Sequence, residues 1–162
     1  MIVTAWRIVK ARYAADAFSG EGARVEGGRW NSPGSPVVYT SQSAALAALE
    51  LLVHLGRSAV LSTYVLVPCS FDERLVSRID PGRLPANWRS YPAPVELQFL
   101  GDNWLRTALS AVLEVPSAVI EIDSNYLLNP RHRDFREIRI ERPRPFQFDA
   151  RLANASRSDS DR

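Results

Sequence analysis

The chain has 162 residues, of which 46% are hydrophobic, and this length and composition suit a single globular domain with a buried core. The formal net charge is +2, and the basic residues are mostly arginines scattered among acids, which is typical of a solvated surface and disfavours a nucleic-acid groove. Cys69 is the only cysteine, which excludes intramolecular disulfides. The chain has only two histidines, His54 and His132, so a zinc site has too few cysteine and histidine ligands.

The N-terminus lacks a basic segment that leads into an apolar core and a cleavage site of small residues, so it does not resemble a signal peptide. No apolar run reaches the ~18 residues that a membrane-spanning helix needs. We therefore expect a cytoplasmic protein that contacts no membrane.

The start of the chain predicts two strands separated by a binding loop. Residues 2–9 are apolar and rich in β-forming side chains, which predicts a strand with Trp6 and Arg7 on opposite faces. Residues 19–36 are rich in glycine and predict an irregular loop. Such a long loop is uncommon in a compact domain unless it is functional or disordered, and its glycine and aromatic content favours a binding loop. A Pro-Gly turn signal ends the loop, and residues 36–40 predict the second strand.

The next segment predicts an apolar helix that carries one acid. Ser41 or Ser43 is suited to cap a helix that continues to Leu55, and Gly56 is placed to end it. The segment is apolar on nearly every side, so we expect the helix to be buried. Glu50 is the exception, an ionisable side chain between two leucines.

The second half of the chain combines an irregular connection with short elements. Residues 60–68 predict a strand, and the prolines that follow between residues 81 and 94 exclude regular structure there. Asp102 is suited to cap a second helix from Asn103, which either reaches Leu113 or gives way to a strand. Further strands are predicted at residues 118–122, 138–140 and 146–148.

These elements indicate a fold class and a domain boundary. The strands do not alternate regularly with helices, which favours an α+β architecture of mixed or antiparallel sheets with flanking helices over a doubly wound sheet. Residues 1–152 are expected to form one domain. Residues 153–162 are rich in serine, aspartate and arginine, and we expect them to be a disordered tail.

Glu50 requires a partner, because an ionised carboxylate left unpaired on a buried helix is strongly destabilising. One interpretation is a partly exposed helix face on which Glu50 pairs with His54, one helical turn further on. The other interpretation is a carboxylate at the floor of a cleft. The sequence leaves both open.

Four other side chains have both a functional and a structural interpretation. Arg29 follows two glycines, so either the backbone approaches a ligand whose phosphate the guanidinium binds, or the segment is a turn with a surface arginine. Arg7 pairs with Glu50, binds phosphate or faces solvent. Tyr39 is a core aromatic residue or a platform for a cofactor. Ser117 is a hydroxyl at the start of a strand or part of a site.

In combination, these residues resemble the RES family, toxins of bacterial toxin–antitoxin pairs that are named for an arginine, a glutamate and a serine. The matching segments occur in the family's order and extend from residue 6 to about residue 152. They are Trp6-Arg7-Ile8, Gly27-Gly28-Arg29-Trp30-Asn31, Pro36-Val37-Val38-Tyr39, Ala48-Leu49-Glu50, Val53-His54-Leu55, Leu100-Gly101-Asp102, Val115-Pro116-Ser117-Ala118-Val119 and Asn125-Tyr126-Leu127-Leu128-Asn129-Pro130.

The resemblance implies a fold similar to that of ADP-ribosyltransferase toxins such as diphtheria toxin, and an enzyme that consumes NAD as a substrate without a prosthetic group or a metal. The catalytic residues it implies are Glu50, Arg29, Tyr39 and Ser117. The residues it implies for NAD binding are Arg7, Arg29, Tyr39, Trp30, Asn31, Ser117 and Asn125. The partner it implies is an antitoxin, a helix-turn-helix protein of the Xre type that obstructs the cleft.

A single carboxylate suits this chemistry. Cleavage of the bond between nicotinamide and ribose generates an oxocarbenium-like sugar that a carboxylate stabilises, and nicotinamide leaves as a neutral molecule without needing an acid. The leading hypothesis is NAD degradation with water or phosphate as acceptor, which arrests growth. The enzymatic alternative is transfer of ADP-ribose to a protein, and the non-enzymatic alternative is a domain that binds a partner or nucleic acid.

Overall fold

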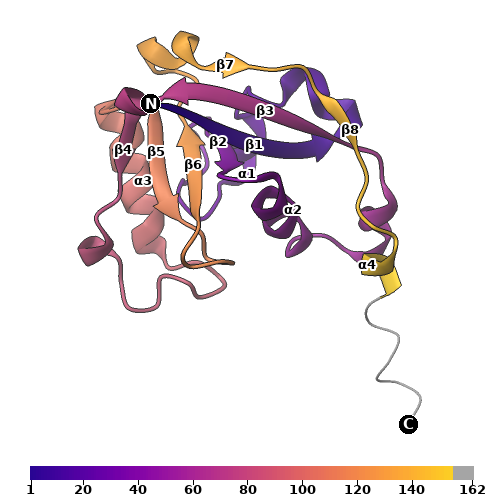
Figure 1. Cartoon of the computed structure of the whole chain (residues 1–162). Helices are drawn as coiled ribbons and strands as arrows, with labels where there is room; N and C mark the ends of the chain where they lie inside the picture. Colours follow the sequence, from indigo (N-terminus) through magenta and orange to yellow (C-terminus); the bar gives the residue numbers. More distant parts are fainter. Residues whose placement is uncertain (155–162) are drawn as a thin grey trace.

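The computed structural model describes residues 1–154, whose strands form one curled, mixed sheet (Figure 1). Seven of the eight strands lie in the order β4-β5-β6-β2-β1-β3-β7, and the eighth, β8, also pairs with β3. Strands β4 and β5 are parallel, and the other paired strands are antiparallel. This arrangement confirms the predicted α+β class. The strands are β1 (Ile2–Lys10), β2 (Val38–Ser41), β3 (Tyr64–Asp72), β4 (Val76–Arg78), β5 (Val112–Pro116), β6 (Ser124–Leu128), β7 (Arg139–Ile140) and β8 (Arg144–Phe146).

The helices flank this sheet. Figure 1 shows α2 beneath β1 and β3, and α3 beside β4 and β5. The α-helices are α1 (Glu21–Glu26), α2 (Ala44–Leu52), α3 (Val95–Thr107) and α4 (Arg151–Asn154), and the short 3₁₀ helices are η1 (Ala11–Asp16), η2 (Arg57–Leu61), η3 (Glu73–Leu75), η4 (Pro81–Arg83) and η5 (Arg133–Glu137). Among residues 1–154, no helix is long and apolar enough to cross a membrane.

Strand β1 confirms the first predicted strand and pairs with β3 along its whole length. The strand predicted at residues 60–68 is displaced, because β3 begins at Tyr64 and continues past Pro68 to Asp72. Proline is disfavoured inside a sheet because it cannot donate to the ladder. Pro68 is tolerated because it falls between the residues that pair with β8 and those that pair with β7, where β3 has no strand partner on that side.

Helix α2 is shorter and more exposed than predicted. The hydroxyl oxygen of Ser43 caps it by accepting a hydrogen bond from the Leu46 N–H at 3.1 Å, and the helix ends at Leu52. Leu46 is buried, but Leu49 is 40% exposed and Val53 59% exposed. The expectation of a fully buried helix is therefore wrong, because only one side of α2 packs against the sheet.

Helix α3 begins earlier than predicted, at Val95 with Pro94 at its N-cap. It ends at Thr107, after which Ala108 adopts a left-handed conformation with φ of 48°. The chain then gives way to β5, the second of the two predicted alternatives. Asp102 therefore lies within α3 and does not cap it.

The strand predicted at residues 118–122 is wrong, because this segment connects β5 to β6. The hydroxyl oxygen of Ser117 accepts hydrogen bonds from the N–H groups of Val119 at 3.1 Å and Ile120 at 3.0 Å, and such local bonds bend the chain away from an extended conformation. Ile122 is 93% exposed and packs into no sheet.

The loop predicted at residues 19–36 is interrupted by α1. Gly20 precedes this helix with φ of 73°, and a Cβ atom there would lie 2.7 Å from the backbone nitrogen of Val37. Glu21 and Arg24 form an ion pair at 2.5 Å across one turn of α1. The loop is therefore more ordered than the glycine content indicates.

The C-terminal predictions have mixed outcomes. Strand β7 confirms the strand predicted at residues 138–140, and β8 lies slightly before the one predicted at residues 146–148. The first two residues of the predicted disordered tail belong to α4, and the rest of that tail, from residue 155, lies outside the described residues.

Two hydrophobic clusters attach the helices to the sheet. Leu97 and Trp104 of α3 pack with Leu127 of β6, and buried Trp30 from the loop after α1 belongs to the same cluster. Ala47 of α2 packs in a separate cluster under β1 and β3. The loop that carries Arg29 is therefore anchored to α3 through the neighbouring tryptophan.

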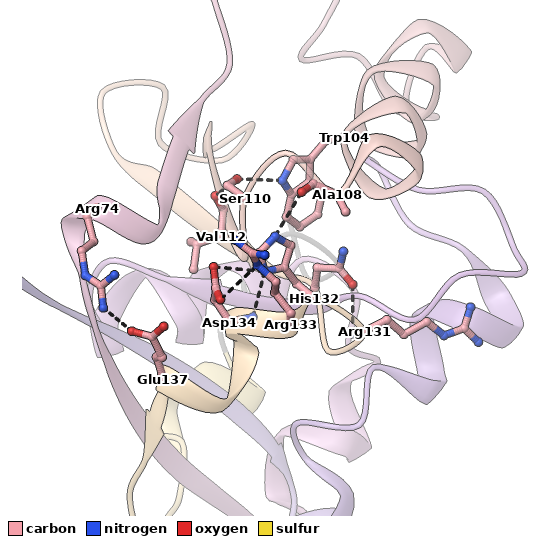
Figure 2. Close-up of polar contacts among 11 residues, drawn as sticks. Arg74, Trp104, Ala108, Ser110, Val112, Arg131, His132, Arg133, Asp134 and Glu137 are labelled. Carbon is pink, nitrogen blue, oxygen red and sulfur yellow. Dashed lines mark hydrogen bonds and ion pairs between the residues drawn. The ribbon is translucent and has the colours of Figure 1, made fainter.

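A polar cluster joins the end of α3 to the turn after β6 (Figure 2). The His132 Nε2 lies 3.1 Å from the carbonyl oxygen of Ala108, and its Nδ1 accepts a hydrogen bond from the Asp134 N–H at 3.1 Å. The indole N–H of Trp104 donates to the Ser110 hydroxyl at 2.9 Å. These contacts satisfy groups at the ends of α3 and η5, so His132 has a structural role.

We predict that Gly101→Ala destabilises the fold. A Cβ atom at Gly101 would lie 1.6 Å from the carbonyl oxygen of Trp30, so the two backbones must separate. Overpacking of this kind costs about 1–3 kcal/mol in the free energy of unfolding, which urea denaturation measures. The matched control is Gly22→Ala in α1, where nothing lies within 4 Å and alanine is expected to be neutral or stabilising. Equal stability of the Gly101→Ala protein and the wild type would contradict the prediction.

Candidate functional site

Glu50 projects from α2 and is held by two neutral donors. Its Oε1 accepts a hydrogen bond from the Ser117 hydroxyl at 2.7 Å and another from the Asn125 side-chain amide at 2.6 Å. No hydrogen bond from the groups that the structure describes reaches its Oε2. One carboxylate oxygen is thus fixed in place while the other is available to a ligand.

Ser41 completes this arrangement and was not predicted as a site residue. Its hydroxyl donates to the Asn125 Oδ1 at 2.7 Å, which leaves the Asn125 NH₂ group facing Glu50. The two residues are opposite each other in the β2–β6 ladder. The sequence alone suggested Ser41 only as a helix cap, because strand pairing is not visible in a single segment.

Ser117 is fully buried, and its hydroxyl acts both as a hydrogen-bond donor and as an acceptor. It donates to Glu50 and accepts from the two N–H groups of the turn that follows β5. These contacts support a role in orienting the carboxylate.

The alternative in which Glu50 pairs with His54 differs from the structure. Glu50 is bonded to Ser117 and Asn125, whereas the His54 ring lies 6.4 Å from the ring of Tyr91, measured between centroids. The carboxylate therefore faces the β5–β6 side of the fold, where Ser117 and Asn125 lie.

Arg29 contributes a half-buried cation from the turn that follows α1. Its Nη1 donates to the carbonyl oxygens of Trp88 at 2.9 Å and Ser90 at 3.1 Å. Partial burial lowers the pKa of Arg29 from the ordinary arginine value, and the negative charge of Glu50 partly offsets this change. The guanidinium is therefore near the carboxylate and is held by neutral acceptors.

Arg7 contributes a second cation from β1. Its Nη1 donates to the carbonyl oxygen of Tyr39 at 2.9 Å, and its buried Nε has no hydrogen-bond partner among the described residues. Burial lowers the pKa of Arg7 to about 10. A buried guanidinium without a carboxylate partner is costly, and a bound anion is one way to compensate it.

Tyr39 fixes the turn that presents Arg29. Its hydroxyl donates to the Asn31 Oδ1 at 2.6 Å and accepts a hydrogen bond from the Trp30 N–H at 3.1 Å. A Cβ atom at Gly28 would lie 2.6 Å from this hydroxyl, so the contact requires glycine there. The tight fit means that Tyr39 and the Gly28–Asn31 turn are built as one unit.

Trp30 and Asn31 lie inside this unit. Trp30 is 3% exposed, and Asn31 is fully buried with its amide donating to the Ala23 carbonyl oxygen at 2.9 Å. Both side chains are therefore interior parts of the turn, and direct contact of either residue with NAD stays a prediction.

The structure thus joins the predicted residues into two neighbouring groups. Ser117, Asn125 and Glu50 form an acidic group, with Ser41 behind it. The second group supplies two cations and the tyrosine that supports the turn; it comprises Arg7, Arg29, Trp30, Asn31 and Tyr39. An anionic ligand with a positively charged end matches this separation of charge.

Comparison with known proteins identifies the family of this chain. Residues 4–149 match the model of the RES domain, so the chain belongs to the RES family, as the sequence predicted. The chain is 40% identical over 148 residues to Toxin Res of Yersinia enterocolitica, covering 91% of this chain and 97% of that protein. It is 37% identical over 158 residues to the Prs ADP-ribosylating toxin of a Sphingobium species, with coverages of 94% and 98%.

The fold also resembles a chain in the crystal structure of the M. tuberculosis MbcT-MbcA toxin-antitoxin complex. The TM-score is 0.77 at 18% sequence identity, and the match covers 96% of this chain and 88% of that one. At this identity the likeness concerns the fold alone.

We predict that Tyr39→Phe destabilises the protein at neutral pH and that the difference narrows in alkali. The substitution removes a buried hydroxyl with two partners, which costs about 1–3 kcal/mol in the free energy of unfolding. Burial raises the pKa of Tyr39 above the ordinary value of 10.0, so above that pH the unfolded wild type loses a proton that the folded state retains. The wild type therefore loses stability that the variant keeps.

Denaturant unfolding from pH 7 to 11 measures this difference. Tyr13→Phe, at a residue that is 51% exposed, serves as the control and is expected to match the wild type at neutral pH. A gap between Tyr39→Phe and the wild type that stays constant across this range would overturn the assignment.

Proposed function

We propose that this protein is a toxin that degrades NAD by cleaving the bond between nicotinamide and ribose. The observation that carries the proposal is the geometry of Glu50, one oxygen of which is fixed by Ser117 and Asn125 while the other is available. Two cations without carboxylate partners in the described part of the chain, Arg7 and Arg29, lie in the adjoining group.

The proposed chemistry requires one carboxylate. The ribose develops positive charge at its anomeric carbon as the glycosidic bond breaks, and Glu50 would stabilise that charge through Oε2. Nicotinamide leaves from a cationic pyridinium as a neutral molecule, so no second acid is needed to protonate it. Because Ser117 and Asn125 are neutral, they orient Glu50 without cancelling its charge.

The two arginines would bind the pyrophosphate. A guanidinium offers a planar set of donors that matches phosphate oxygens. The unpartnered Nε of Arg7 supports this role, because a phosphate oxygen would supply the missing acceptor. Arg29 would exchange its contacts with the carbonyl oxygens of Trp88 and Ser90 for stronger, charge-assisted ones.

The acceptor for the ADP-ribosyl group would be water or phosphate. Purified protein incubated with NAD, with and without inorganic phosphate, should release nicotinamide. ADP-ribose as the second product indicates water, whereas a phosphorylated ADP-ribose formed only when phosphate is present indicates phosphorolysis. Absence of nicotinamide release under both conditions would exclude NAD degradation.

A second candidate function is transfer of ADP-ribose to a protein, favoured by the relative that is named an ADP-ribosylating toxin. The same carboxylate would then orient a side chain of the target protein. NAD labelled in its ADP-ribose portion, incubated with cell lysate, distinguishes the two candidates. Only transfer leaves label on a protein band.

Binding to nucleic acid has less support, since many of the surface arginines form ion pairs with acidic residues of the same chain. Such pairing is typical of a solvated surface and not of a groove that follows a phosphate backbone. The pairs include Arg24–Glu21, Arg74–Glu137, Arg78–Glu114 and Arg89–Glu121.

A toxin that depletes NAD must be restrained in its own cell, so the proposed function includes an antitoxin partner. The similar M. tuberculosis structure is that of a toxin-antitoxin complex. Three strongly exposed apolar side chains lie on segments that border the site: Val53 just after α2, Tyr91 beside Ser90, and Ile122 after Ser117. We expect an Xre-type helix-turn-helix antitoxin to cover this rim. Co-purification with the product of the adjacent gene tests the partnership.

We predict that Glu50→Gln lowers kcat for NAD cleavage by about 100-fold or more. The amide keeps the shape and still accepts hydrogen bonds from Ser117 and Asn125, but it removes the charge that stabilises the transition state. The control Glu26→Gln changes an exposed carboxylate and is expected to retain full activity. Full activity of Glu50→Gln would exclude the proposed mechanism.

We predict that Arg29→Ala acts mainly on binding. Loss of a charged hydrogen bond to phosphate costs about 1.5–3 kcal/mol, which raises KM for NAD by roughly 10-fold to 100-fold. Arg12→Ala removes an exposed arginine and should leave KM unchanged. A KM within twofold of the wild type for Arg29→Ala would remove this residue from the binding site.

A further inference from the structure

We infer that one face of α3, formed by Gln98, Gly101 and Asp102, positions Arg29 for its ligand, and that Gln98 is the residue on which this depends most. The three residues share a side of the helix, because positions three and four apart are neighbours. The inference rests on the proposed function in one respect, that Arg29 binds NAD.

The hydrogen bonds of Gln98 are the first observation. Its side-chain NH₂ group donates to the carbonyl oxygen of Gly28 at 3.0 Å and to that of Asn31 at 3.2 Å. The Gly28 N–H also donates to the Asn31 carbonyl oxygen at 2.9 Å, which closes the turn. Gln98 therefore ties together the two residues that enclose Arg29 and Trp30.

The contacts on either side of Gln98 are the second observation. The Asp102 carboxylate accepts hydrogen bonds from the Ser32 N–H at 3.0 Å and the Ser32 hydroxyl at 2.5 Å. Gly101 has no side chain, so the carbonyl group of Trp30 packs directly against the helix. The whole turn, from residue 28 to residue 32, is thus fixed to α3.

The guanidinium group of Arg29 is also held by the part of the chain next to α3. The acceptors of its Nη1 are the carbonyl oxygens of Trp88 and Ser90, in the segment that leads into α3. The backbone of the turn and the guanidinium therefore have one common support, and a shift of the turn relative to α3 moves the cation away from its acceptors. Preorganisation of this kind matters because small displacements of a binding group weaken ligand binding strongly.

The positioning role of Gln98 can be tested without disturbing the residues that pack α3 against the sheet. The helix packs through Leu97 and Trp104, whereas Gln98 is only partly buried and directs its side-chain hydrogen bonds to the turn. Gln98→Glu keeps the length of the side chain but replaces the donor by an acceptor that repels both carbonyl oxygens. The neighbouring Phe99, which is 63% exposed and lies off this face, provides the control Phe99→Ala.

The test is a double-mutant cycle with Gln98→Glu, Arg29→Ala and the double variant, in which KM and kcat for NAD are measured for each. We expect Gln98→Glu to raise KM roughly tenfold with kcat within about twofold of the wild type. The same substitution should leave KM unchanged when Arg29 is already alanine. A role in overall stability would instead lower the activity of both backgrounds. An unchanged KM for Gln98→Glu, or an equal effect in the two backgrounds, overturns the inference.

Failure of the proposed function has a separate signature, because the wild type itself would then cleave no NAD. In that event, hydrogen exchange at the backbone N–H groups of Gly28 and Ser32 decides the positioning role. We expect Gln98→Glu to accelerate this exchange at least tenfold and Phe99→Ala to leave it unchanged. Equal exchange in Gln98→Glu and the wild type overturns the inference without reference to activity.

Discussion

The pair of hydrogen bonds to one oxygen of Glu50 is the interaction on which the site depends. A half-buried carboxylate on an otherwise apolar helix must be compensated, and a cation in direct contact would do so by neutralising it. Here the donors are the hydroxyl of Ser117 and the amide of Asn125, so the charge is solvated but retained. Much of the surrounding architecture serves to aim these donors: the turn after β5 fixes Ser117, and the β2–β6 ladder brings Ser41 to Asn125.

The two cations of the site are likewise held by neutral groups. Arg7 and Arg29 are bonded to backbone carbonyl oxygens, and neither forms an ion pair with a carboxylate in residues 1–154. Negative and positive charge therefore remain separate and uncancelled within one site. NAD has a cationic pyridinium next to a ribose and an anionic pyrophosphate further along, so under the proposed function both charges of the site would find a partner.

The sequence predicted the local parts of this account better than the long-range ones. A run of apolar, β-forming residues identified β1, and the family motif identified Arg29, Tyr39, Glu50, Ser117 and Asn125, which the structure brings together. The burial of Trp30 and Asn31 was not visible, because a buried turn and an exposed turn share the same glycine signature.

The missed residues are those whose function depends on another segment. Asp102 was interpreted as a helix cap, since aspartate before a helical run usually is one, but its partner is Ser32, seventy positions away. Ser41 and Gln98 have no local motif at all, and only the sheet register and the packing of α3 reveal their partners. Strand β3 was misplaced because Pro68 is tolerated only by the arrangement of β7 and β8 along its edge.

The most direct test of the central claim is a crystal structure of the Glu50→Gln protein soaked with NAD, which would retain intact substrate. We expect the anomeric carbon of the nicotinamide ribose to lie beside the side-chain amide at position 50, and the pyrophosphate to lie on Arg29 and Arg7. NAD bound elsewhere on the protein, or no NAD density at millimolar concentration, would contradict the account.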